Sequence, residues 1–180
     1  MSEPIIPIKK IGEEKWVEKL TDFLEKYDVG VETLDFNSDF KLPDEMIDYY
    51  KHFGGIDSSD FMYNLYKPDK FIKLKESHWS FLKEKFKDED IEHFLVFSES
   101  PGNDPVCLNL EDSSIHFFSH DPIKSMKIFD DFNQYLRYEI IEIQKLMGDV
   151  EFDKKEEILY QKKNLNSGDI DYDFRYMKFC

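Results

Sequence analysis

The chain of 180 residues contains little cysteine and almost no arginine. Its two cysteines, Cys107 and Cys180, are too few and too far apart for a disulfide framework or a metal-binding spacing. Only Arg137 and Arg175 are arginines, and 39 acidic residues against 24 lysines and arginines give a formal net charge of −15. A chain of this charge repels phosphate, which argues against binding to nucleic acid.

Long apolar segments are also missing. No stretch approaches the roughly 20 apolar residues that a membrane span requires. The N-terminal segment MSEPIIPIKK has no apolar run long enough for a signal peptide. Binding to anionic lipid would need a basic face, and none is visible. We therefore expect a cytoplasmic protein that binds neither membranes nor nucleic acid.

Aromatic residues, by contrast, are abundant, with 17 Phe and 10 Tyr. Together with an apolar fraction of 41%, they can fill the core of one domain of this length. The chain has no internal repeat and no low-complexity linker. We assign residues 1–148 to a single domain and residues 149–180 to a C-terminal extension that packs on the same domain.

Apolar residues at three- and four-residue intervals predict helices over 13–27, 42–55, most of 71–86 and 130–147, with a polar helix over 151–165. In the segment 42–55, Pro43 fits the first helical position, and Gly54 and Gly55 supply the stop. We interpret Pro43, Gly54, Gly55 and Gly102 as structural residues.

Short apolar runs bounded by turn residues predict strands at 61–66, 94–97, 106–110 and 115–119. The last three follow one another with brief turns, which is typical of an antiparallel meander. In 169–179, aromatic residues alternate with polar ones, and this pattern predicts a strand or an ordered arm with one apolar face. Such a face would either pack on the chain's own sheet or contact a second copy.

Residues with catalytic potential form no complete set. The pair His120 and Asp121 invites comparison with metal-assisted hydrolases, but the other histidines have no ligand spacing, and loop hydrogen bonding explains His120 equally well. Ser98, Ser100 and Gly102 do not form the Gly-x-Ser-x-Gly turn of a hydrolase. We expect no catalytic residue, no metal and no cofactor.

The order of the predicted elements resembles the SUKH superfamily. The helix from Leu42-Pro43 to Gly54-Gly55 resembles the family's signature helix. Residues 94–110 are similar to its strand, glycine-containing turn and strand, although Gly102 is the one glycine where the family commonly has more. Residues 115–121 and 129–136 resemble its next strand and its closing helix. The resemblance covers residues 42–136 and implies an α+β fold in which helices surround a central, mostly antiparallel sheet.

The resemblance also implies a function in binding proteins. Bacterial members of the superfamily are frequently immunity proteins that neutralise toxins, often nucleases, while eukaryotic relatives act as interaction modules in cell-wall and signalling networks. A nuclease toxin needs a basic cleft, and exposed carboxylates can occupy such a cleft in place of phosphate. Our candidate binding residues are loop acids at the two ends of one predicted strand: Glu99, Asp104, Glu111 and Asp112.

Other interpretations stay open at this stage. The four loop acids could be ordinary solvated turn residues, and the −15 charge could serve only solubility. A regulatory scaffold of the same fold, binding a cellular protein other than a toxin, is the main alternative to an immunity protein. We expect a monomer or a weak homodimer.

Overall fold

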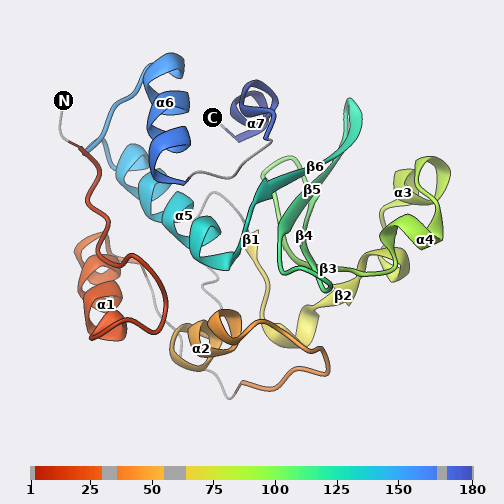
Figure 1. The fold of residues 1–180 in the computed structure, drawn as a ribbon, viewed down its shortest axis with the longest axis horizontal. Coiled ribbons are helices and arrows are strands. Elements are labelled where there is room, and N and C mark those ends of the chain that lie inside the picture. Colours follow the sequence, from red (N-terminus) through yellow and green to blue (C-terminus); the bar gives the residue numbers. More distant parts are fainter. Residues whose placement is uncertain (1–2, 30–35, 55–63, 166–169, 180) are drawn as a thin grey trace.

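The computed structural model describes residues 3–29, 36–54, 64–165 and 170–179 (Figure 1). Gly55 and the first half of the strand predicted at 61–66 lie outside these ranges. The elements in the described residues are α1 (Trp16–Lys26), α2 (Asp44–Phe53), β1 (Asn64–Leu65), β2 (Ile72–Lys73), α3 (Ser80–Lys85), α4 (Asp88–Ile91), β3 (Phe94–Glu99), β4 (Pro105–Asn109), β5 (Ile115–His120), β6 (Ile123–Phe129), α5 (Phe132–Leu146), α6 (Lys154–Asn164) and α7 (Tyr172–Phe179).

The strands form an antiparallel sheet in the order β1-β3-β4-β5-β6, with β2 also pairing with β3. This arrangement confirms the predicted α+β fold and its antiparallel meander. Two strands carry an extra residue, because the pairing skips Phe97 in β3 and Ile128 in β6. Such bulges bend the strand locally and leave one residue outside the regular ladder.

Both faces of the sheet are covered, which explains the uninterrupted apolar run of β3. Leu95 and Phe97 point into a large core shared with α1, α2 and α5. Phe94 and Val96 point the other way, into a smaller core under α3 and α4. A strand that is buried on both faces loses the alternation of polar and apolar residues that marks a half-exposed strand.

Helix α2 ends as the sequence predicts. Gly54 has a positive φ of 64°, and its N–H donates to the Tyr50 carbonyl, so a glycine suits this position sterically. Pro43 is the residue before the helix, with φ −59° and ψ 148°, and not its first helical residue. Tyr49 and Tyr50, which follow in α2, have no exposed surface and lie among aromatic rings of the large core.

Three parts of the predicted secondary structure are wrong or incomplete. Within the segment 71–86, only Ser80–Lys85 forms an α-helix. Strand β2 and a 3-10 turn at Leu74–Glu76 precede this helix and pack on the sheet. Strand β6 was not predicted. The tail that we predicted as a strand or arm forms helix α7.

Helix α7 packs against the outer side of β6 (Figure 1). The side chain of Arg175 is 1% exposed, and its guanidinium donates to the carbonyl of Ile128, the extra residue of the β6 bulge, at 2.8 Å. The guanidinium also lies over the rings of Phe129 and Tyr138. An exposed ion pair between Lys124 of β6 and Asp171 adds a second link.

Candidate partner-binding surface

The four predicted binding acids do not form one patch. Glu99 ends β3 and Asp104 precedes β4, whereas Glu111 and Asp112 lie in the turn between β4 and β5. The sheet register pairs Glu99 with Pro105, so the first two acids lie at one end of β4 and the other two at its opposite end. A single partner surface would therefore use one end or the other.

At the first end of β4, the carboxylates are engaged by the fold. Asp104 is only 2% exposed, and its Oδ1 accepts the backbone N–H of His120 at 3.0 Å and contacts the His120 Nδ1 at 2.5 Å. Glu99 is half-buried and accepts the hydroxyl of Tyr66 at 2.8 Å. These bonds hold the β3–β4 loop against its neighbours and leave Asp104 with almost no surface for a partner.

At the second end, the acids differ in role. Asp112 accepts two hydrogen bonds from Ser114, one from the backbone N–H at 2.9 Å and one from the hydroxyl at 2.5 Å. Burial alone would raise the pKa of Asp112, but these bonds and the nearby His116 and Lys127 lower it below its usual value. Both acids are exposed, and Asp112 in addition shapes the turn through these bonds.

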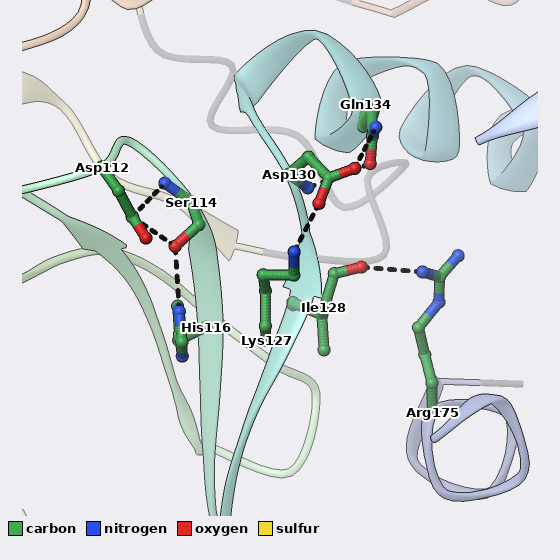
Figure 2. Close-up of polar contacts among 8 residues, drawn as sticks. All are labelled: Asp112, Ser114, His116, Lys127, Ile128, Asp130, Gln134 and Arg175. Atoms are coloured by element: carbon green, nitrogen blue, oxygen red, sulfur yellow. Dashed lines mark hydrogen bonds and ion pairs between the residues drawn. The ribbon is translucent and has the colours of Figure 1, made fainter. Parts of the chain in front are cut away.

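Ser114 also bonds His116, which completes an Asp-Ser-His trio (Figure 2). Burial lowers the pKa of His116 to about 4, and Lys127 adds to this effect, so the ring is neutral at pH 7. Since the single hydroxyl proton of Ser114 goes to Asp112, the His116 Nε2 donates to the hydroxyl oxygen. In a catalytic triad the histidine accepts that proton instead. The hydrogen bonds of this trio therefore stabilise the turn and do not have the direction of a catalytic triad.

A second polar cluster lies beside the trio on β6 and α5 (Figure 2). The Lys127 ammonium contacts the Asp130 carboxylate at 2.5 Å, and the Gln134 amide donates to the same carboxylate at 2.9 Å. Burial would raise the pKa of Asp130, but these two partners lower it. The sequence analysis predicted neither cluster, although their bonded residues lie only two to four positions apart. Hydrophobic periodicity does not report the turn geometry that brings such polar side chains together.

A pocket connects the exposed end of β4 with the start of α2. Its volume is about 210 Å³, and it is lined by Lys41, Leu42, Pro43, Leu108, Asn109, Leu110, Glu111 and Ser113. The structure thus brings Pro43, which we interpreted as structural, next to Glu111, which we predicted as a binding residue. The lining is mixed: apolar side chains lie beside the Glu111 carboxylate, a combination that suits a long cationic side chain, and Lys41 also lines the pocket.

Residues 34–138 match the SMI1 / KNR4 family (SUKH-1). The chain belongs to this family. The match confirms the resemblance that the sequence motifs indicated, and it includes α2, β3 to β6 and both ends of β4. No curated protein and no solved structure gives a match to the chain. Helices α6 and α7 lie outside the SMI1 / KNR4 match.

In this SMI1 / KNR4 domain, Gly102, which we interpreted as structural, lies in the β3–β4 loop. A Cβ on Gly102 would meet only the Ser100 hydroxyl at 3.7 Å, so the space around Gly102 does not demand a glycine.

In the described part of the chain, no group of three His, Cys, Asp or Glu side chains is placed to hold a metal ion. Within the same residues, no helix is both long and apolar enough to cross a bilayer. Cys107 is buried in β4.

Proposed function

We propose that the protein is a non-enzymatic, cytoplasmic immunity protein that binds and neutralises a cognate bacterial toxin. The observation that carries the proposal is the SMI1 / KNR4 match over the residues that contain the exposed end of β4 and its pocket. The net charge of −15 supports a basic partner, such as the nucleic-acid-binding cleft of a nuclease.

The contact surface that we propose is the β4–β5 turn together with the start of α2. Glu111 projects from a turn that Asp112, Ser114 and His116 hold in place, so its carboxylate is presented with little freedom in the backbone. A lysine or arginine of the toxin could pair with Glu111 while its stem lies against Leu42 and Leu110. Loops fixed on a rigid sheet are common binding positions.

The test uses the product of the gene adjacent to this one. We expect the two purified proteins to form a complex and co-expression to rescue cells that the toxin poisons. The substitution Glu111→Lys should weaken the complex by about tenfold or more, since it replaces an attraction by a repulsion at the interface.

The matched control is Glu25→Lys on the exposed face of α1, which changes the net charge equally. It should alter the affinity by less than about twofold, because screening weakens charges beyond roughly 10 Å. Absence of any complex and of rescue would contradict immunity, and equal effects of both substitutions would contradict the proposed surface.

A regulatory scaffold that binds another cellular protein is the second candidate, and family membership favours it equally. The two candidates differ in gene context and in phenotype. A gene far from any secreted effector, whose deletion alters growth without a toxin being present, would favour the scaffold.

A further inference from the structure

Helix α6 differs in charge from the chain as a whole. It carries four lysines and two glutamates, of which Glu157 is buried, whereas the net charge of the chain is −15. Helices α6 and α7 lie next to each other on the side of the molecule away from α2 (Figure 1). A partner of this side therefore contacts a surface whose charge differs from that of the acidic β4–β5 turn.

A groove of about 400 Å³ runs between α6 and α7. Its residues are Lys154, Lys155, Ile158, Leu159, Lys162 and Asp173. On α6, the spacing of Lys155, Leu159 and Lys162 puts an apolar side chain between two lysines on one side of the helix. Leu159 is 57% exposed. The groove therefore combines uncovered apolar surface with cationic ends.

The lysines are unequally engaged. Lys154 bridges the two helices through a 2.8 Å contact with Asp173, and it also lies over the ring of Tyr176. Lys162 lies over the ring of Tyr172. Among the described residues, neither Lys155 nor Lys162 forms an ion pair. These two ammonium groups are available to an anionic ligand.

The opposite, buried side of α6 fixes the groove. The Gln161 amide oxygen accepts the Arg175 guanidinium at 2.9 Å, which links α6 directly to α7. Glu157, 2% exposed, accepts the Gln161 amide and contacts Lys145 of α5. Because these contacts hold the two helices, a ligand would not have to order them on binding.

We propose that the α6–α7 groove binds an acidic amphipathic helix of a partner protein. Lys155 and Lys162 are two helical turns apart, about 10 Å, so two carboxylates spaced by seven residues on the partner can reach both. Apolar residues between those carboxylates would cover Ile158 and Leu159. The groove is independent of the toxin surface proposed above, and its charge selects the opposite kind of partner.

Other occupants fit less well. A membrane with anionic lipids would also meet the lysines, but the net charge of −15 opposes its approach. A second copy that presented the same groove would place the lysines of both copies against each other. An acidic helix avoids both conflicts.

The test uses a fluorescein-labelled peptide of about 14 residues, long enough for four helical turns. Its leucines lie on one helical face and glutamates fill the other positions. Fluorescence anisotropy with the full-length protein should show saturable binding that weakens with salt. A peptide of the same composition with scattered leucines, and one with lysines in place of glutamates, should bind at least about tenfold more weakly.

Substitutions in the protein locate the site. The pair Lys155→Glu and Lys162→Glu should weaken peptide binding by about tenfold, and Leu159→Asn should weaken it by about fivefold. Lys163→Glu on the same helix, exposed but outside the groove, should change it by less than about twofold. Circular dichroism and thermal unfolding check that each variant is folded.

Four outcomes of the binding measurements would overturn the proposal, and a fifth comes from sedimentation. The first four are no binding of the acidic peptide, equal binding of the lysine peptide, equal weakening by Lys163→Glu, and binding to phosphatidylglycerol vesicles that depends on Lys155 and Lys162. Sedimentation provides a further check. A dimer that Leu159→Asn dissociates would show that a second copy covers the groove, and this result would also overturn the proposal.

Discussion

Carboxylates are used differently at the α5–α6 contact and at the β4–β5 turn. At the helix contact, Glu142 and Glu157 are 1% and 2% exposed and share the ammonium of Lys145 at 3.0 and 2.9 Å. At the turn, Asp112 holds the backbone while Glu111 faces solvent. The comparison shows that the same residue type stabilises the fold in one region and is available for recognition in the other.

The two regions also respond to pH in opposite directions. Burial raises the pKa of Glu142 to about 7, and Glu157 adds to this rise although Lys145 opposes it. Burial lowers the pKa of His116 at the turn to about 4. Between pH 4.5 and about 7, Glu142 is protonated in the folded protein and ionised in the unfolded chain. Between pH 6.5 and about 4, His116 is neutral in the folded protein and protonated in the unfolded chain.

The largest expected effect is that of Lys145→Met. The substitution removes the cation that two buried carboxylates contact, so the free energy of unfolding at pH 8 should fall by about 3 kcal/mol. The loss should shrink at pH 5, where Glu142 is protonated. Urea unfolding measures both values, and Lys163→Met on the exposed face of α6 should change them by less than about 0.5 kcal/mol. A loss of equal size at both pH values would contradict the shared-cation explanation.

A smaller effect is expected from Glu142→Gln. Because the folded-state pKa lies above the unfolded value of 4.5, the stabilisation is complete below 4.5 and is lost as the pH rises through 7. Glutamine does not titrate, so the variant should lack this loss and gain about 2 kcal/mol relative to the wild type between pH 5 and pH 8. Denaturant midpoints across that range provide the measurement. Parallel pH profiles for the two proteins would show that Glu142 does not titrate as described.

The β4–β5 turn should show the opposite dependence of stability on pH, and the smallest of the three effects. Since the folded-state pKa of His116 lies below the unfolded value of 6.5, stability is lost as the pH falls from 6.5 towards 4. His116→Gln keeps a donor for Ser114 but cannot be protonated, so it should remove about 1–2 kcal/mol of that acid-induced loss.

Ser114→Ala is the matched control for this prediction, because it removes the hydroxyl and keeps the imidazole. Its acid-induced loss should persist, even though its stability is lower at every pH. If Ser114→Ala abolished the acid dependence and His116→Gln did not, the group that titrates at the turn would be another one.

Sequence patterns predicted most of the fold where local signals and tertiary packing agree. Helix α2 has acidic residues at its start and Gly54 at its end, and β3 to β5 are apolar runs between turns. Strand β6 was not predicted because its sequence lacks an apolar run. Among the described strands it lies at the edge of the sheet, most of its residues are exposed or half-buried, and two of them are lysines, Lys124 and Lys127.

The tail shows how a short pattern misleads. Tyr172, Phe174 and Tyr176 alternate like strand residues, but Tyr172 and Tyr176 are also one helical turn apart. The deciding residue is Arg175, whose buried contacts with Ile128 and Gln161 exist only in the helix. A charged residue in the core is rare enough that periodicity alone does not anticipate it.

The candidate site was harder to predict than the fold. The sequence placed Asp104 and Glu111 in loops, and both positions are confirmed, but their exposure depends on contacts with distant residues. Asp104 is buried because His120, sixteen residues later, folds over it. Exposure of a loop acid is thus a tertiary property, and the binding role of the four acids stays a prediction.

The contact between Arg175 and the Ile128 carbonyl has a consequence for solubility. The last strand of a sheet presents unpaired backbone groups that can template the addition of a strand from another molecule, which begins aggregation. Helix α7 occupies this place beside β6 and removes one acceptor that an incoming strand would need. A shortened chain that ends before residue 170 would lack this contact, so we expect it to associate with itself more readily than the full chain.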